Sequence, residues 1–450
     1  MTPGGPSGCQ AGSGPRSLRP LAGVLTAMAV SLTGTRISAI ALPWFVLVTT
    51  GSTARTGLVV FCEMVPYVVV KALTGPLVDR AGPRTVSWTA DVLSAVAAGA
   101  VPLLHALDRL SFGPLLFLVA LIGAARGPGD LAKEVMVPEA AERGRMPLER
   151  AAGLAGVTER LASTAGPALG GSAVALLGPL TALAANAACF ALGSVVVLLT
   201  LDRRPRAAPP PSSAPGDGHE PGSAPEPGYR RRLGEGFRFL RRDPLLLTVT
   251  VMVGVTNLLD AALNSLLLPV WARDSGHGPS AIGLIGSALG IAAVGGSLIA
   301  AAVAHRLRRR AVFFTGFLLG GAPRFLVLAL DLPLWAVAGV FAVSGFGLGF
   351  LNPILGAVMF ERIPRPLLGR VKALGAALAW AGIPLGGLVA GVSVAAAGLA
   401  TVLLAGAAAY ALTTGLAGLR PEWREMDRRR ARDVPGRPRE APTAGSAAGT

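Results

Sequence analysis

We single out nine ionisable side chains within stretches of the sequence that are otherwise almost entirely apolar. These residues are Arg36, Glu63, Lys71, Asp91, Arg126, Glu159, Arg160, Asp260 and Arg324. In a helix that crosses a bilayer each such charge costs about 3 kcal/mol on insertion scales, unless it faces a partner or water. We therefore expect these side chains to be paired or to line a water-filled cavity, and several of them to be functional.

A polar stripe accompanies the charges. Asn257, Asp260 and Asn264 follow one another at intervals of three and four residues, so they share one face of a helix. On an otherwise apolar helix, this stripe indicates either a solute pathway or hydrogen bonds that hold neighbouring helices together.

The motifs of enzyme chemistry are missing from the sequence. Lys71, Lys133 and Lys372 are the only lysines, and they are followed by Ala, Glu and Ala, so no phosphate-binding loop ends in Gly-Lys-Ser/Thr. The histidines, at positions 105, 219, 277 and 305, are too scattered for a metal site, and no Gly-x-Ser-x-Gly motif is present. We expect neither an enzyme nor a bound metal, and no cofactor other than an ion gradient.

The composition is that of an integral membrane protein. Of 450 residues, 52% are hydrophobic and only 15% are charged, and the mean hydropathy is +0.57. The net charge of +16 could suggest nucleic acid, but this apolar content argues against such a partner. Runs of about 20 apolar residues predict twelve spanning helices, all α-helical because lipid offers the backbone no hydrogen-bond partner. The predicted spans are residues 20–48, 55–78, 85–105, 112–132, 151–177, 179–201, 244–270, 279–304, 311–330, 334–360, 371–396 and 398–419.

The distribution of basic residues predicts the orientation. With both termini in the cytoplasm, 33 of the 41 Lys and Arg residues fall in inside segments and only Arg55, Arg109 and Arg273 fall in outside loops. The chain then divides into a cytoplasmic tail, a six-helix half, a Pro-rich cytoplasmic linker, a second six-helix half and a basic cytoplasmic tail. These segments are residues 1–19, 20–201, 202–243, 244–419 and 420–450.

The two halves contain matching local sequences, which indicate a duplication. Arg80 and Arg84 after the second span correspond to Arg306 and Arg310 after the eighth. Residues 166–171 of the fifth span, GPALGG, correspond to residues 382–387 of the eleventh, GIPLGG. Two parallel six-helix repeats joined by a long linker are typical of secondary transporters.

The loop from Gly75 to Arg84, with its Gly-x-x-x-Asp-Arg-x-Gly-x-Arg pattern, resembles the loop signature of the major facilitator superfamily. The finer pattern is similar to the drug and siderophore exporter branch, which includes macrolide efflux proteins and enterobactin exporters. That similarity rests on Gly51-Ser52, on the run from Gly236 to Pro244, and on residues 369–371.

The resemblance implies roles for several groups of residues. A cytoplasmic gate would consist of Gly75, Asp79, Arg80, Gly82 and Arg84, and a helix-packing motif similar to that of antiporters would consist of Gly166, Pro167, Gly170 and Gly171. Spans 1, 4, 7 and 10 would line a central cavity, which would place Arg36, Arg126, Asn257, Asp260, Asn264 and Asn352 there.

Arg126-Gly127 resembles a motif that this superfamily links to proton coupling. Since an arginine stays protonated, a nearby carboxylate would have to carry the proton, and Asp260 and Glu63 are the candidates. We expect Glu63 to pair with Arg36 and Lys71 to pair with Asp91; either a proton relay or a purely structural set of ion pairs would explain these charges.

Three functions fit these observations. The first is a monomeric, proton-coupled exporter of small hydrophobic or amphipathic molecules in the plasma membrane, working by alternating access. The second is import or facilitated diffusion of a metabolite through the same fold, and the third is a membrane sensor or scaffold that does not transport.

Overall fold

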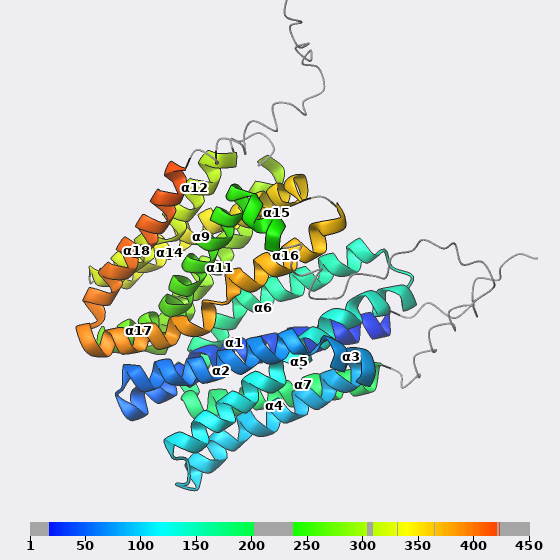
Figure 1. Cartoon of the computed structure of the whole chain (residues 1–450). Helices are drawn as coiled ribbons and strands as arrows, with labels where there is room; N and C mark the ends of the chain where they lie inside the picture. The colour runs from blue at the N-terminus through cyan, green and yellow to red at the C-terminus, as the bar shows by residue number, and fades with distance from the viewer. Residues whose placement is uncertain are drawn as a thin grey trace, which may run out of the picture.

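The computed structural model describes residues 18–201, 237–303, 309–330, 332–363, 365–420 and 423. Helices account for nearly all of these residues, and no strand occurs among them (Figure 1). The predicted linker falls mostly outside this part of the chain, as do the first 17 residues and all of the C-terminal tail beyond Arg420 except Trp423.

The first half of the chain forms seven helices. They are α1 (Arg19–Thr50), α2 (Thr53–Leu73), α3 (Gly75–Ala81), α4 (Pro83–Ala106), α5 (Phe112–Arg143), α6 (Leu148–Leu177) and α7 (Pro179–Thr200). The predicted second span is therefore broken at Thr74, and α3 is a separate short helix. α5 continues about three turns beyond the predicted end of the fourth span, which changes the position of the charges after residue 132.

The second half is more interrupted. It contains α9 (Pro244–Ala262), the π-helical turn η1 (Leu263–Leu267), α10 (Leu268–Asp274), α11 (Gly278–Val303), α12 (Arg309–Gly320), α13 (Ala322–Ala329), α14 (Leu334–Gly349), α15 (Leu351–Arg362), α16 (Arg365–Trp380), α17 (Ile383–Ala397) and α18 (Leu399–Leu419). The interruptions divide predicted spans 7, 9, 10 and 11 into consecutive helices.

Ten helical stretches are long and apolar enough to cross a membrane among the residues described. The described residues of each of the twelve predicted ranges are mostly helical, but α6 is not among the ten and α14 is shorter than the others. The chain is thus an all-helical, multi-pass membrane protein, while the count of twelve spans stays a prediction.

Local sequence explains where several helices begin and end. The Asp243 carboxylate accepts hydrogen bonds from the backbone N–H groups of Leu245 and Leu246 at 3.1 Å, which caps the start of α9. Gly178 and Gly398 have φ angles of 83° and 79° at the turns that enter α7 and α18, a conformation that glycine adopts without strain. The two halves therefore make equivalent turns with a glycine of positive φ.

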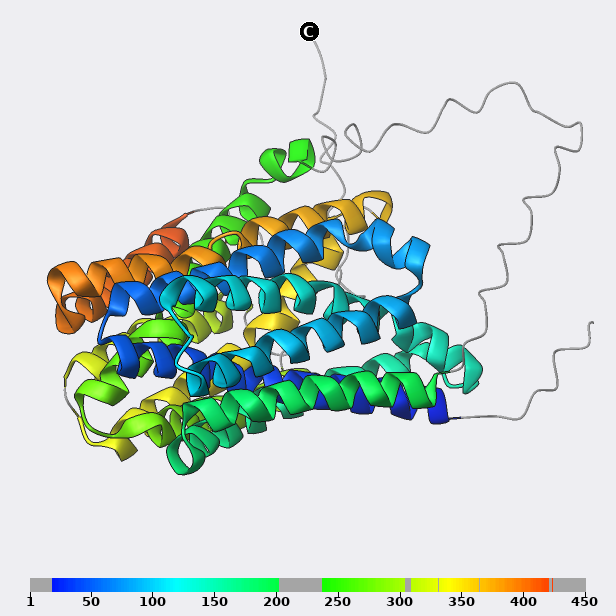
Figure 2. The same ribbon diagram turned by 90° about the horizontal axis from the view of Figure 1, so that it is seen from below.

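The helices of the first half lie together, and those of the second half lie beside them (Figures 1 and 2). Contacts between the halves are concentrated in two helix pairs, α6 with α11 and α2 with α17. Glycines permit both contacts: a Cβ on Gly171 would lie 2.7 Å from the Gly283 Cα, and one on Gly391 would lie 3.2 Å from the Gly57 Cα. The predicted boundaries of the two halves stay predictions.

Candidate functional site

A cavity of about 900 Å³ lies between the two halves. Its walls come from α1, α2, α5 and α6 on one side, and from α9, η1 and the α16–α17 junction on the other. Six of the residues predicted for the cavity and for proton coupling line it: Arg36, Glu63, Arg126, Asn257, Asp260 and Asn264. Asn352 belongs to α15, but its side chain lies outside the described part of the structure.

The cavity extends along the bundle toward the end where α5 finishes and α6 starts. Pro138 and Leu148, which belong to these two helix ends, contribute to its lining. Pro43 and Asn264, which lie further along α1 and in η1, line its other part. α1 also begins at the α5–α6 end, so the opening is on the same side of the bundle as the residues that precede α1.

The first-half wall carries three polar pairs between α2 and α5. They are Glu63 with Arg126, Tyr67 with Asp130, and Lys71 with Glu134. The members of each pair are separated by 63 residues, and successive pairs lie one helical turn apart. We call these six residues the α2–α5 ladder; all of them line the cavity.

The innermost pair is the shortest and most buried of the three. An Arg126 Nη1 atom lies 2.8 Å from Glu63 Oε1, and both side chains are only 8% exposed. The Arg126 guanidinium also lies over the Tyr67 ring, 4.4 Å from its centroid. Removal of Arg126 would leave the Glu63 carboxylate buried without a cation, which is costly, whereas removal of Glu63 would leave Arg126 with only the more distant Asp130 carboxylate.

The other two pairs are looser. The Tyr67 hydroxyl donates to Asp130 Oδ2 at 3.3 Å, and the same carboxylate oxygen is 3.9 Å from Arg126 Nε. Lys71 Nζ lies 3.1 Å from Glu134 Oε1, with side chains that are 22% and 56% exposed. Asp130 and Glu134 are thus the ladder carboxylates most available to a solute.

Two predicted pairings differ from those in the structure. Glu63 binds Arg126 rather than Arg36, whose Nη2 atom donates to Ser163 Oγ at 3.0 Å. Asp91 binds Lys133 rather than Lys71, at 2.7 Å. The reason in the second case is the length of α5: Lys133 was predicted in a cytoplasmic loop but is part of this helix, and its ammonium group reaches into the bundle.

The Lys133–Asp91 pair is the most enclosed ion pair among the described residues, with each side chain 3% exposed. Lys133 Nζ also donates to Ser31 Oγ at 2.9 Å, so the pair connects α1, α4 and α5. It lies at the edge of the cavity, which Ser31 and Lys133 help to line.

On the second-half wall, the described residues form one ionic pair. Asp260 Oδ1 lies 2.5 Å from Arg324 Nη2 on α13. The Arg324 side chain is 2% exposed, whereas that of Asp260 is 27% exposed and faces the cavity. The sequence had suggested no partner for Arg324.

Asn257 and Asn264 flank Asp260 and make hydrogen bonds to the backbone. The Asn257 side chain donates to the carbonyl of Ala379 at 2.9 Å, and that of Asn264 donates to the carbonyl of Asp260 at 2.7 Å. The three members of this polar stripe line the cavity, and Asn257 also joins α9 to α16 by a hydrogen bond. A solute pathway along the stripe stays a prediction. The π-turn η1 contains Asn264, and such turns frequently occur at functional sites.

The predicted gate residues run from the start of α3 to the first turn of α4. Gly75 starts α3, Arg80 is exposed, and Gly82 has a φ of 81°. Arg84 donates to the carbonyl of Leu198 at 3.0 Å, near the end of α7, and Arg310 donates to the carbonyl of Gly418 at 3.1 Å, near the end of α18. These equivalent contacts support the internal duplication. The side chain of Asp79 lies outside the described part of the structure.

The helix-packing motif lies where α6 meets α1 and α11. A Cβ on Gly166 would overlap the Arg36 side chain, and one on Gly170 would lie 3.1 Å from the Ile37 Cα. Gly171 meets α11, as described above, and Pro167 also faces α11, 2.8 Å from a Cβ built on Gly286.

The equivalent glycines of α17 repeat this arrangement. A Cβ on Gly386 would lie 2.6 Å from the Leu258 carbonyl on α9, and one on Gly387 would lie 2.8 Å from the Val60 side chain on α2. In each half, the first glycine of the Gly-Gly pair (Gly170 or Gly386) contacts a helix of its own half. The second (Gly171 or Gly387) contacts a helix of the other half.

The ladder acids Asp130 and Glu134 were not predicted as site residues. A signal for them exists in the sequence: Glu63, Tyr67 and Lys71 recur every four residues, and so do Arg126, Asp130 and Glu134. Two polar stripes of equal length indicate helices that face each other. Among the described residues, no group of three or more His, Cys, Asp or Glu side chains is arranged to hold a metal ion.

The fold and cavity define a transporter of the major facilitator type. The profile of the transmembrane secretion effector family matches residues 15–441, so the chain belongs to that family within the major facilitator superfamily. This membership makes it a transporter and not an enzyme.

Two curated relatives are efflux proteins. The chain is 31% identical over 412 residues to the multidrug efflux pump Tap of Mycolicibacterium fortuitum, covering 91% of this chain and 97% of that protein. It is 28% identical over 235 residues to the enterobactin exporter EntS of Escherichia coli O1:K1, covering 51% of each chain.

Solved structures show the same fold at low sequence identity. The nucleoside transporter NupG superposes with a TM-score of 0.67 at 13% identity, covering 91% of this chain and 99% of that one. An inward-facing, unoccupied bacterial homologue of the lysosomal transporter Spinster superposes with a TM-score of 0.65 at 13% identity, over 93% and 99% of the chains.

Proposed function

We propose that this protein exports small amphipathic molecules across the plasma membrane, driven by a proton gradient. The observation that carries the proposal is the cavity of about 900 Å³ between the halves, with its charged α2–α5 ladder on one wall. The similarity to the Tap efflux pump over almost the whole chain supports the export direction.

The two walls differ in chemistry, which favours an amphipathic solute. Side chains from the second half include Ala261, Trp380 and Ile383, which offer apolar surface, together with the amides of Asn257 and Asn264. The first-half wall offers the partly exposed carboxylates of Asp130 and Glu134. A solute with an apolar body and a polar or cationic group would satisfy both walls at once.

Alternating access would use the two glycine contacts between the halves. Because α6–α11 and α2–α17 contain close backbone approaches, each pair can act as a pivot when one half tilts against the other. In the state described here the cavity reaches the end where α6 begins. We place both termini at that end in the cytoplasm, with the protein acting as a monomer and with a small molecule as its only partner besides the bilayer.

Proton coupling would centre on Asp260. Its carboxylate is the acid of the second half that faces the cavity, and Arg324 holds it from the buried side. Protonation would remove the attraction to Arg324 and release α13 from α9, so that a proton could change the conformation of this half. Glu63 is a second candidate, but its buried pair with Arg126 makes a structural role more consistent with the geometry.

An efflux assay tests the proposal. Everted vesicles that contain the protein are energised with a proton gradient, and uptake of a panel of fluorescent dyes and antibiotics is followed with and without a protonophore. We expect gradient-dependent accumulation of at least one compound, abolished by the protonophore. Accumulation that is insensitive to the protonophore would contradict proton coupling, and uptake into intact cells would favour import.

The Asp260→Asn variant tests the role of Asp260. We expect it to insert normally, retain substrate binding, and lose at least 10-fold in gradient-driven efflux, because the amide cannot exchange a proton. The matched control is Asp274→Asn at the exposed end of α10, which should transport normally. Unchanged efflux in Asp260→Asn would remove Asp260 from the mechanism.

A further inference from the structure

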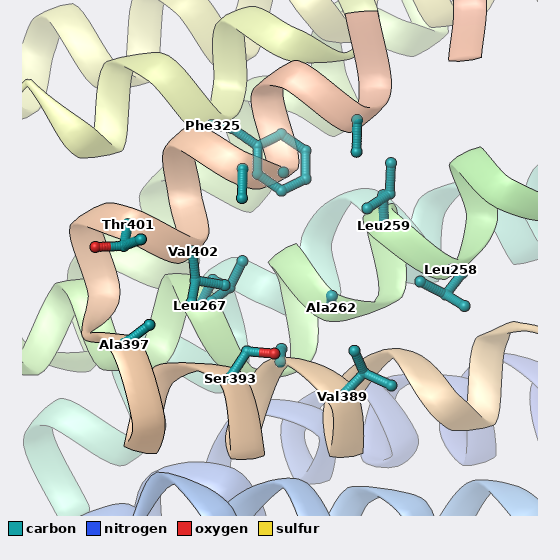
Figure 3. A pocket seen from close by; sticks show the side chains of 14 residues that line it. Leu258, Leu259, Ala262, Leu267, Phe325, Val389, Ser393, Ala397, Thr401 and Val402 are labelled. Carbon is teal, nitrogen blue, oxygen red and sulfur yellow. The ribbon is translucent and has the colours of Figure 1, made fainter. Parts of the chain in front are cut away.

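A second, apolar pocket lies on the side of the second half. Its volume is about 340 Å³, at the lower end of the roughly 300–1,000 Å³ of ligand pockets. Helices α17 and α18 form its sides, while α9, η1 and α13 form its floor (Figure 3). The figure shows Phe325 and Leu259 across the pocket from Ser393 and Val389. We call this site the lateral pocket.

The floor and the rim of the lateral pocket differ in exposure. Ala262, Leu267 and Phe325, on the floor, are at most 7% exposed. Val389 on α17 is 50% exposed, and Ala405 on α18 is also exposed at the rim. The pocket therefore opens outward between α17 and α18, on a surface formed by two candidate membrane spans.

The described residues that line the pocket carry no charge, and the polar side chains among them are the hydroxyls of Ser393 and Thr401. Thr401 lies close to the turn between α17 and α18, where the spans leave the membrane. On α17, Val389 lies eight residues from Ala397, and on α18, Ala409 lies eight residues from Thr401. Eight helical residues span about 12 Å, so Val389 and Ala409 are about that much further from the α17–α18 turn. The pocket is thus elongated along the helices, from the α17–α18 turn toward the middle of the membrane.

We propose that the lateral pocket binds one acyl chain of a phospholipid from the leaflet at the α17–α18 turn. The shape, the uncharged lining and the outward opening match an extended hydrocarbon chain that enters from the bilayer, with its ester end near Thr401 and its methyl end near Leu258. Filling the floor with hydrocarbon restores the dispersion contacts that an empty apolar crevice would lack. The pocket is distinct from the central cavity, and the proposal does not depend on export or proton coupling.

The bound chain touches the same helix as the central site. Leu258, Leu259 and Ala262 of α9 face the lateral pocket, whereas Asn257 and Asp260 of the same helix face the central cavity. On α13, Phe325 forms the pocket floor next to Arg324. A lipid chain in the pocket therefore supports both helices that carry the Asp260–Arg324 pair.

Photo-crosslinking in vesicles tests the site. The full-length protein is reconstituted in phosphatidylethanolamine and phosphatidylglycerol that contain a trace of phosphatidylethanolamine with a diazirine on one acyl chain, and adducts are mapped by mass spectrometry. With the diazirine at the chain terminus we expect adducts on the buried floor, at Leu258 or Phe325. With the diazirine near the ester we expect them near Thr401.

A blocking variant and a matched control complete the test. Ala405→Phe places a ring at the rim and should abolish the floor adducts, whereas Ala408→Phe, at an exposed position of α18 outside the pocket, should leave them unchanged. Adducts confined to outward-facing residues such as Leu404 in the unmodified protein would overturn the proposal. So would equal floor labelling in the two variants.

Discussion

At the scale of single residues, burial separates the ion pairs of the first half into two kinds. The Lys133–Asp91 pair has side chains that are each 3% exposed, whereas the Lys71–Glu134 pair has side chains 22% and 56% exposed. A buried pair that loses one partner leaves an uncompensated charge, but an exposed pair exchanges its partner for water. Loss of the lysine charge should therefore affect stability differently at positions 133 and 71.

We expect Lys133→Met to lower the free energy of unfolding by about 3–5 kcal/mol, since Asp91 would be left buried without a cation. Lys71→Met should cost about 0–1 kcal/mol. Denaturant unfolding of the purified protein in mixed micelles measures both values. In the Lys133→Met/Asp91→Asn double variant, much of the loss should be recovered; a loss equal to the sum of the two single variants would contradict direct pairing.

At the scale of helices, glycine pairs decide how closely the two halves approach. Gly283 on α11 meets Pro167 and Gly171 on α6, and a Cβ built on it would lie 2.7 Å from the Pro167 carbonyl oxygen. Gly295, on the same helix, has no neighbouring atom within 4 Å of such a Cβ. The two glycines thus allow a comparison in which only the contact differs.

We expect Gly283→Ala to separate α6 from α11 and to reduce transport at least 10-fold. The added methyl group would collide with backbone atoms of Pro167 and Gly171, which cannot move aside as a flexible side chain can. Gly295→Ala should transport normally and gain slightly in stability, by up to about 1 kcal/mol, since alanine favours a helix. Transport rates and expression levels of the two variants provide the measurement. Equal activity would show that the tight α6–α11 contact is not required for transport.

At the scale of the whole molecule, the conformation is open at the end of the bundle where α6 begins. Ala152 of α6 lines this part of the cavity and is exposed. Alternating access requires this end to close during transport, so the reactivity of a side chain there reports the state of the protein.

We expect a cysteine at Ala152, in a variant in which Cys9, Cys62 and Cys189 are serine, to react quickly with a membrane-impermeant thiol reagent on the cytoplasmic side. Addition of a transported substrate should lower the rate, because part of the population closes. A cysteine at Ala408 on the outer surface of α18 serves as the lipid-facing control and should not react. A rate at Ala152 that stays constant under turnover would argue against alternating access.

Sequence alone determined the helical class, the approximate helical ranges and most of the residues that carry charge within the apolar stretches. Lipid imposes these features locally: each backbone group must bond within its own helix, and each charge stands out against an apolar stretch. The matched glycine motifs and Arg84 with Arg310 were likewise visible, since a duplication leaves its signal in the sequence.

Only the tertiary structure decided which charges meet. Glu63 lies beside Arg126 and not Arg36, because the rotation of α2 against α5 sets the ladder, and packing fixes that rotation. Asp91 binds Lys133 because α5 continues beyond its apolar stretch, a boundary that hydropathy does not mark. The Asp260–Arg324 pair depends on how the second half places α9 and α13, since side chains distant in the sequence meet only where the fold brings them together.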